Sequence, residues 1–364
     1  MSRCLLTPFV LVALLAPALA QQPAAKSALA LDDAERKAVI DGVLERVTKN
    51  YVFPDVAKKM EGAIRERQAK KEYDAITTGQ ELAETLTKHL REVCKDKHLG
   101  VRYSPEPLPK DTGRRPTEEE LKKRQRQLAL RNYGFKKAER LGGGVGLLEF
   151  EVFMQPEEIG DTAAAAMNFL ANSEAVIVDL RRNGGGSPEG VILLCSYFFD
   201  EPVHLNSIYT RGTDTTRDFW SHPTVAGKKL VGKDVYVLTS GRTFSGAEEF
   251  AYNMQSQKRA TIIGETTGGG AHPTRGFRVT DHFSVGVPFA RSINPVTKTN
   301  WEGTGVKPDV AVPADQALHA AHLLALKKLA EKHAGDKDMA AAIKRETVAV
   351  QKELDDLKAR AGGR

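Results

Sequence analysis

The sequence is poor in cysteine and tryptophan, and it has no long apolar stretch after its first twenty residues. Three cysteines and two tryptophans occur among 364 residues, which is too few cysteines for a disulfide framework. Cys4 lies in a predicted export signal, while Cys94 and Cys195 could pair in an oxidising compartment, a point that the sequence leaves open. No later segment is apolar enough to span a bilayer, so we expect no stable membrane insertion.

Motifs of the common metal and cofactor sites are also missing. The sequence has no His-Glu-x-x-His motif and no cysteine cluster, so we expect no bound metal and no cofactor. Its net charge of +6 is mild. Basic residues cluster over 122–126, but acidic residues precede them over 118–120 and no aromatic residue is interleaved, which indicates a solvated helix face. We therefore expect no nucleic-acid partner.

The first twenty residues have the three parts of a secretory signal. Arg3 precedes an apolar run over 5–19, which ends in the small-x-small triplet Ala18-Leu19-Ala20. The run is shorter than the roughly twenty residues of a membrane-spanning helix, and two prolines interrupt it. We therefore expect cleavage near Ala20 and export to the periplasm or the medium.

Composition and periodicity divide the rest of the chain. Residues 21–30 are rich in alanine and glutamine and predict a flexible mature N-terminus. Helical periodicity predicts a small helical domain over 31–103, and four prolines then mark a linker that leads into a charged helix, together 104–131. Alternating strands and helices over 132–315 predict an α/β domain with a mostly parallel, twisted sheet and flanking helices. The remaining 316–364 is predicted to be a charged helical tail.

Ser245 lies where a predicted buried strand ends and a predicted helix begins. Strand-forming residues over 235–239 precede it, and apolar residues at three-, four- and seven-residue spacing follow over 247–254. A serine at a helix N-terminus is near free backbone N–H groups and the positive end of the helix dipole, which suits a nucleophile. With Glu248 three residues later, Ser245 also fits a capping box, in which it only satisfies the first helical turn.

A glycine triplet and two histidines are further candidates for a site. Residues 184–186 are all glycine and follow a predicted core strand over 175–180. Such a turn can bring amides to an oxyanion, although a plain glycine turn is the alternative; no Gly-Lys-Ser/Thr follows, which excludes a phosphate loop. Among nine histidines, His98 at a helix-to-strand boundary and His272 after a glycine stretch are the rival candidates for a general base.

Taken together, six segments resemble the tail-specific or C-terminal processing proteases, the S41-type serine peptidases. The resemblance is to the branch of the tricorn core and of interphotoreceptor retinoid-binding protein, which lacks a PDZ domain, and it spans about residues 35–315. It implies a ClpP/crotonase-like protease core. The matching segments are Asp96-x-His98-Leu99, Asn132-Tyr133-Gly134-Phe135, Asp179-Leu180-Arg181-x-Asn183-Gly184-Gly185-Gly186, Thr243-Phe244-Ser245-Gly246-Ala247-Glu248-Glu249-Phe250, Gly264-Glu265-Thr266-Thr267-Gly268-Gly269 and Gly305-Val306-x-Pro308-Asp309.

The resemblance implies an exported serine endopeptidase that cleaves protein or peptide substrates through an acyl-enzyme at Ser245. The processing proteases use a lysine after the serine, but the matching stretch 268–272 contains none. The tricorn-like plan instead implies His98 as the base and Glu302 as the acid that holds it. The implied oxyanion hole consists of the amides of Gly185 or Gly186 and of Gly246.

Two departures and one rival function accompany this resemblance. Lys97 stands where the tricorn-like plan has a serine that links histidine to glutamate, and Asp96 is a substitute for that link. Residues 104–143 are too few for a PDZ domain. The rival function is a non-catalytic carrier of hydrophobic ligands, which has no need of a serine, a histidine and a glutamate at these places. An esterase would want a Gly-x-Ser-x-Gly elbow, which the sequence around Ser245 lacks.

Overall fold

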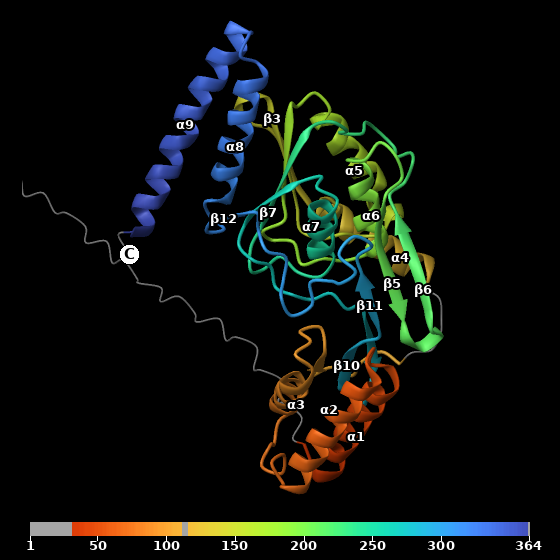
Figure 1. Ribbon diagram of the computed structural model, residues 1–364. Coiled ribbons are helices and arrows are strands. Elements are labelled where there is room, and N and C mark those ends of the chain that lie inside the picture. Colours follow the sequence, from red (N-terminus) through yellow and green to blue (C-terminus); the bar gives the residue numbers. More distant parts are fainter. Residues whose placement is uncertain (1–30, 111–115, 363–364) are drawn as a thin grey trace, which may run out of the picture.

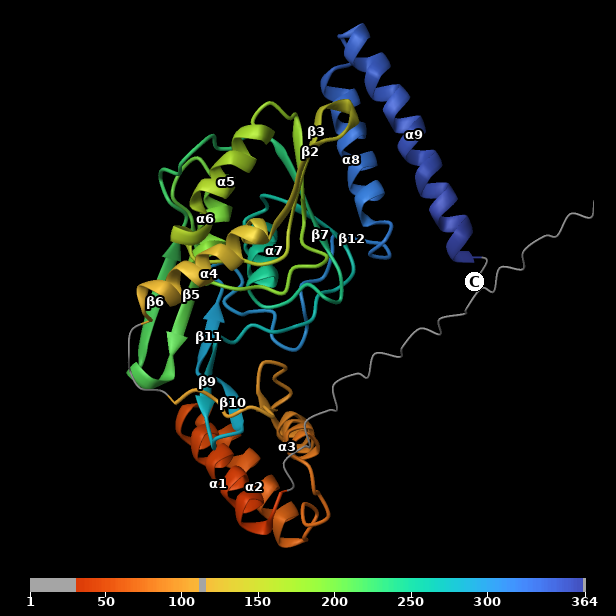
Figure 2. The same ribbon diagram turned by 180° about the vertical axis from the view of Figure 1, so that it is seen from behind.

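The computed structural model describes residues 31–110 and 116–362 (Figure 1). The predicted export signal and flexible mature N-terminus, residues 1–30, lie outside the described residues. A small lobe with three helices lies at one end of the molecule, a larger α/β lobe occupies the middle, and two C-terminal helices project at the other end (Figures 1 and 2).

The larger lobe is built on a six-stranded sheet, and this confirms the predicted fold class. Its strand order is β12-β8-β7-β4-β3-β2, with every neighbouring pair parallel except β2 and β3. All five residues of β4 are buried, as expected of a parallel strand that is covered on both faces. The strands are β2 (Phe135–Arg140), β3 (Val145–Phe150), β4 (Ala175–Asp179), β7 (Asp234–Thr239), β8 (Thr261–Gly264) and β12 (Val310–Ala311).

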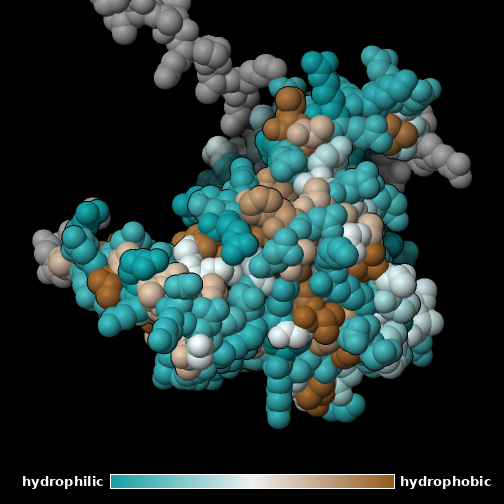
Figure 3. Space-filling view, turned by 90° about the horizontal axis from the view of Figure 1, so that it is seen from above, coloured by the Kyte–Doolittle hydropathy of each residue, from teal (hydrophilic) through white to brown (hydrophobic). Residues whose placement is uncertain are grey.

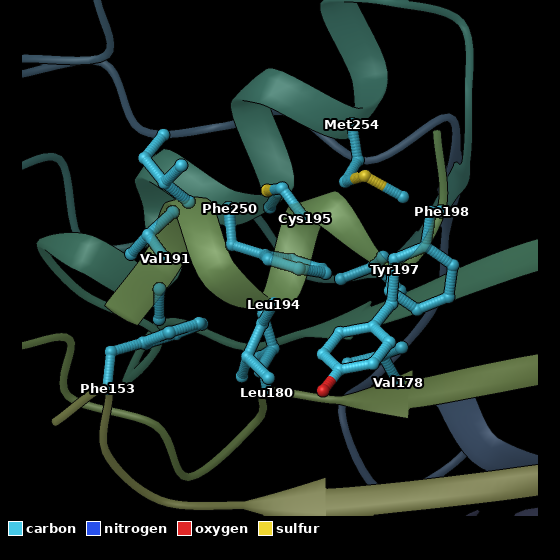
Figure 4. Packing of buried hydrophobic residues seen from close by; sticks show 14 of the residues in the cluster. Phe153, Val178, Leu180, Val191, Leu194, Cys195, Tyr197, Phe198, Phe250 and Met254 are labelled. Atoms are coloured by element: carbon cyan, nitrogen blue, oxygen red, sulfur yellow. The ribbon is translucent and has the colours of Figure 1, made fainter. Parts of the chain in front are cut away.

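Helices cover both faces of this sheet. On one face, α5 (Pro156–Leu170), α6 (Pro188–Ser196) and α7 (Gly246–Ser256) share a core with the sheet. In that core, Phe250 and Met254 of α7 lie against the residues of α6 (Figure 4). On the other face, α8 (Ala317–Lys332) packs on the sheet, and α9 (Lys337–Gly362) packs on α8. The helix that carries the candidate nucleophile is therefore anchored in the largest apolar core.

A three-stranded antiparallel sheet adjoins the larger lobe. Its order is β11-β5-β6, formed by β5 (His204–Thr210), β6 (Thr215–Trp220) and β11 (Ala290–Ile293). The sequence analysis did not predict these strands or β2. Three short 3-10 turns lie at Asn132–Gly134, Gly142–Gly144 and Arg211–Thr213.

The small lobe is assembled from two distant parts of the chain. Its helices are α1 (Asp33–Asn50), α2 (Pro54–Ala69) and α3 (Gly79–Cys94), and its antiparallel sheet has the order β1-β10-β9. Strand β1 (Gly100–Tyr103) comes from the N-terminal segment, whereas β9 (Thr274–Arg278) and β10 (Phe283–Pro288) come from within the predicted α/β region 132–315. Three side chains of β10 belong to the same apolar core as the helices: Phe283, Val285 and Val287. A division of the chain at residue 103 therefore leaves part of this lobe out.

The remaining helix, α4 (Glu118–Leu130), lies on the surface and buries no residue. Seen from above, the surface is mostly hydrophilic, with apolar residues in small groups (Figure 3). Among the described residues, no helix is long and apolar enough to cross a membrane. Cys94 and Cys195 are both free thiols, and Cys195 is buried.

The close approach of α6 to the preceding loop gives a testable prediction about packing. A Cβ atom at Gly190 in α6 would lie 2.1 Å from the carbonyl oxygen of Met154, whereas a Cβ at Gly160 in α5 would meet nothing within 4 Å. Gly190→Ala should lower the free energy of unfolding by about 1–3 kcal/mol, because the backbone must shift. The matched Gly160→Ala should raise it by up to ~1 kcal/mol through helix propensity. Urea unfolding of both variants tests this; equal stabilities would contradict the packing.

Candidate active site

Ser245 occupies a strained turn between β7 and α7. Its backbone angles are φ 55° and ψ −123°, a region that residues with a Cβ rarely adopt. The glycine turn after β4 fits closely against it, since a Cβ at Gly185 would lie 2.7 Å from the Ser245 Cβ and 2.6 Å from the Gly246 nitrogen. A strand, a sharp turn and a helix thus hold the serine at a helix N-terminus, an arrangement typical of nucleophilic serines.

Two free amides lie beside this serine. The Gly185 amide donates to Asn183 Oδ1 at 2.9 Å. This amide is therefore not free to bind an oxyanion, contrary to the expectation for Gly185. Gly186 and Gly246 are neighbours, because a Cβ on Gly246 would lie 3.0 Å from the Gly186 nitrogen. Within the described part of the chain, neither of these two amides has a hydrogen-bond acceptor. Gly186 and Gly246 are therefore the pair that can receive an oxyanion.

Glu248, in the first turn of α7, ties the serine turn to a second loop. Its buried carboxylate accepts hydrogen bonds from the Ser245 amide at 2.8 Å, the Gly269 amide at 2.6 Å and the Gly270 amide at 2.8 Å. The Thr267 hydroxyl is a fourth donor, at 2.5 Å. Burial raises the pKa of Glu248, and these hydrogen bonds oppose that shift. The bond from the Ser245 amide is one half of the predicted capping box; the other donors were not foreseen.

His98 lies against this second loop and lines the same pocket as Ser245. Its ring lies 4.6 Å, centroid to centroid, from the ring of Phe244. Gly270 fits closely against both rings, because a Cβ there would lie 2.3 Å from Phe244 and 2.7 Å from His98 Cε1. The His98 Nδ1 atom is buried and has no hydrogen-bond partner. Burial lowers the pKa of His98 below its usual 6.5, so the imidazole is neutral and able to accept a proton near neutral pH.

The rival histidine, His272, lines the same pocket and is fixed by carboxylates. Its Nδ1 lies 2.7 Å from Asp96 Oδ2 and 3.5 Å from Glu302 Oε2. Asp96 also accepts the His98 amide hydrogen at 2.9 Å, and Tyr51 lies 3.4 Å from Asp96 Oδ2. The two histidines that the sequence offered as alternatives are thus parts of one cluster.

Glu302 completes this cluster from the loop before β12. The Ala271 amide donates to its Oε2 at 2.6 Å, and its Oε1 is buried without a partner. A nitrogen of His98 and a carboxylate oxygen from each of Asp96 and Glu302 lie within 4.8 Å of one another. Burial, with the Asp96 charge adding to it, raises the pKa of Glu302 to about 7. The neighbouring Trp301 donates to the Gly270 carbonyl at 2.7 Å, which secures the same loop.

Lys97 takes no part in this cluster. Its Nζ donates to the Gly268 carbonyl at 2.6 Å. The carboxylate of Asp96, one residue earlier, faces the histidines instead. The sequence offered Asp96 only as a substitute for the missing serine. The two hydrogen bonds that Glu248 accepts from the Gly269 and Gly270 amides were not predicted, because residues 21 and 22 positions apart give no local pattern.

The walls of the pocket that contains Ser245 are partly apolar and partly charged. Ile208, Phe219 and Phe289 supply apolar surface, while Arg217 pairs with Glu189 across 2.9 Å. Glu249 also lines the pocket and is only 4% exposed. Asn206 donates to its Oε1 at 3.0 Å, and burial raises the pKa of Glu249 to about 7. This cavity can receive an extended segment whose reacting bond lies at Ser245.

Two family models match the chain. "Peptidase family S41" matches residues 144–312, and "N-terminal domain of peptidase S41 in eukaryotic IRBP" matches residues 23–130. The first covers the strands and loops that carry Ser245 and Glu302, and the second covers the segment that carries His98. The chain therefore has a peptidase family S41 domain preceded by an S41 N-terminal domain, in line with the resemblance of the six segments.

Similar proteins agree with this family. The chloroplastic carboxyl-terminal-processing peptidase 2 of Arabidopsis thaliana is 31% identical over 143 residues, which are 39% of this chain and 27% of that protein. A carboxyl-terminal-processing protease of Synechocystis is 26% identical over 140 residues, 38% of this chain and 31% of that protein. The match thus spans about a quarter to a third of the length of these relatives. A crystal structure of a candidate peptidase from Parabacteroides merdae has the same fold, with a TM-score of 0.56 at 20% identity over 80% of this chain and 96% of that one.

The strain at Ser245 gives a prediction that does not depend on activity. Ser245→Gly and Ser245→Ala both remove the hydroxyl, but only the alanine keeps a Cβ at the positive φ. We expect the Ser245→Gly variant to be more stable than Ser245→Ala by about 1 kcal/mol, because glycine adopts this region without steric cost. Denaturant unfolding of the two proteins measures the difference. A more stable Ser245→Ala variant would contradict a strained turn.

Proposed function

We propose that this chain is an exported serine endopeptidase, which hydrolyses protein or peptide substrates through an acyl-enzyme at Ser245. One observation carries the proposal: a single pocket brings together a serine on a strained turn, two unsatisfied amides and a half-buried neutral histidine. Each of these features is costly in a merely structural loop. The export signal predicted over residues 1–20 supports a periplasmic or secreted location.

The proposed reaction begins with proton transfer from Ser245 Oγ to His98. The serine oxygen attacks the carbonyl carbon of the substrate, and the carbonyl oxygen becomes an oxyanion that the Gly186 and Gly246 amides receive. The tetrahedral intermediate collapses when protonated His98 gives its proton to the leaving amine. Water, activated by His98, then hydrolyses the ester at Ser245, which returns the enzyme to its starting state.

Glu302 is proposed to stabilise the imidazolium that forms on His98. The His98 Nδ1 and Glu302 Oε1 atoms are both buried and both lack partners, so a bond between them would satisfy a donor and an acceptor at once. Asp96 is a positioning residue in this scheme, because it accepts the His98 amide and holds His272. Because Lys97 stands in place of a bridging serine, His98 and Glu302 are proposed to be linked directly or through a water molecule.

The substrates are proposed to be unfolded or C-terminal peptide segments, in line with the processing peptidases to which the chain is similar. The rival function, a carrier of hydrophobic ligands, fits this pocket poorly. Five ionisable side chains line it beside the apolar ones: His98, Glu189, Arg217, Glu249 and His272. A purely apolar ligand would desolvate these groups without offering them a hydrogen-bond partner of its own.

Labelling of the serine tests the nucleophile and the base together. Ser245→Ala should abolish peptide hydrolysis, a loss on the order of 10⁴-fold or more, and should prevent labelling by a fluorophosphonate. His98→Ala should lose nearly as much, whereas His272→Ala should be milder. Peptide mapping of the labelled wild-type protein should locate the adduct at Ser245. Undiminished turnover by folded Ser245→Ala would refute the proposal, and a larger loss in His272→Ala would transfer the role of base to His272.

The pH dependence of turnover tests Glu302. With a pKa of about 7, the Glu302 carboxylate is ionised above pH 7. Below pH 7 it becomes protonated and no longer stabilises the imidazolium of His98. His98 stays neutral to below pH 6.5. The rate at saturating substrate should therefore fall first through pH 7, with a second fall at lower pH.

Glu302→Gln is the matching variant for that profile. It should lower kcat by roughly 10²- to 10⁴-fold with little change in KM, and it should remove the fall near pH 7. Glu249→Gln is the control, because Glu249 has a similar pKa in the same pocket. If the fall in rate near pH 7 persists in Glu302→Gln but disappears in Glu249→Gln, that fall arises from Glu249, and the proposed role of Glu302 is wrong.

A further inference from the structure

Four side chains with metal-binding atoms converge behind Ser245. Asp96 is 1% exposed and His272 is 5% exposed, while His98 and Glu302 are half-buried. The His272 Nδ1 atom lies 2.7 Å from Asp96 Oδ2 and 3.5 Å from Glu302 Oε2. His98 joins them, since one of its nitrogens and one oxygen of each carboxylate all lie within 4.8 Å.

The cluster has more acceptors than donors. Two carboxylates share this desolvated space, and like charges so close repel each other unless a proton or a cation lies between them. The buried Glu302 Oε1 and His98 Nδ1 atoms have no hydrogen-bond partner. A cation at the centre of the four side chains would satisfy both atoms and balance the two carboxylates.

The donor set is of the kind that a transition metal prefers. Two imidazole nitrogens and two carboxylate oxygens suit Zn²⁺, whereas Mg²⁺ and Ca²⁺ take oxygen ligands and Cu(I) takes sulfur. With bonds of about 2.0–2.2 Å, tetrahedral ligands lie roughly 3.4 Å apart. The 3.5 Å between His272 and Glu302 already matches that spacing. The His98 nitrogen and the two carboxylate oxygens lie within 4.8 Å of one another, so side-chain shifts are needed to close the ligand set around an ion.

We infer that Asp96, His98, His272 and Glu302 form a binding site for a divalent transition-metal ion such as Zn²⁺, and that the bound ion switches the nucleophile off. Binding itself is independent of the proposed peptidase activity, and only the switch rests on it. An ion on His98 Nδ1 leaves the proton of that neutral ring on Nε2, so Nε2 cannot accept the serine proton. Protons compete with the ion for imidazole nitrogens and carboxylate oxygens, so binding should weaken as pH falls.

Calorimetric titration of Zn²⁺ into the full-length Ser245→Ala protein tests the site without self-cleavage. We expect one ion to bind per chain, with weaker binding at lower pH. His98→Ala and Glu302→Gln should each weaken binding at least tenfold, in proteins whose folding is verified by circular dichroism. His282→Ala is the control, because that ring contacts the Ser104 carbonyl in the small lobe, and it should bind Zn²⁺ like the parent. Absence of saturable binding, or equal binding by His98→Ala, would overturn the site.

Fluorophosphonate labelling of the wild-type protein tests the switch separately. Saturating Zn²⁺ should block labelling of Ser245, and a chelator should restore it. If Zn²⁺ binds to the cluster but labelling continues, the switch is overturned while the metal site stands. If Ser245 is never labelled, with or without metal, the peptidase proposal fails while the calorimetric result still decides the metal site.

Discussion

The buried carboxylate of Glu248 is the interaction on which the rest of the site depends. It accepts the amide of Ser245 on one side and the amides of Gly269 and Gly270 on the other, so one side chain sets the distance between the serine turn and the second loop. A hydrogen bond to a charged group stabilises by about 1.5–3 kcal/mol, and several are needed to offset the desolvation of a buried carboxylate. The position of this loop in turn determines where His272 and the Trp301 ring lie and where the Ala271 amide contacts Glu302.

Glycine residues allow the loops around Ser245 to pack closely against one another. Gly185 packs on the Ser245 backbone, and Gly270 lies against the rings of Phe244 and His98, at distances that leave no space for a Cβ. The strain of the serine turn is sustained because α7 is fixed in the large core by Phe250 and Met254 (Figure 4). The apolar packing and the polar cluster are thus one system, since a rigid helix is the support against which the turn is held.

Sequence patterns predicted what is local in this structure. Continuous apolar runs such as 175–179 identified the parallel strands, and the strand-to-helix boundary identified Ser245, because each depends on neighbouring residues. Antiparallel strands β5, β6, β9, β10 and β11 were missed. Strands β6 and β9 expose most of their residues and so lack an apolar pattern. Distance along the chain explains why His98 and His272 were treated as rivals: 174 positions separate them, and only the fold brings both to Asp96. The hydrogen bond from the Gly185 amide to Asn183 depends on the conformation of the turn. The sequence does not predict that conformation, because three consecutive glycines can adopt many backbone angles.

The composite small lobe has a consequence for when the site can form. Its core needs Phe283, Val285 and Val287 of β10, so the N-terminal helices cannot complete their packing until almost 290 residues of the chain have been made. Such non-local closure is intrinsically slow, because the loop entropy is spent before the contacts form. His98 follows α3 and the serine follows β7, so the two meet only after that closure. A growing chain therefore holds Ser245 and His98 apart until β10 has been made, and the order of synthesis delays the formation of the pocket that they share.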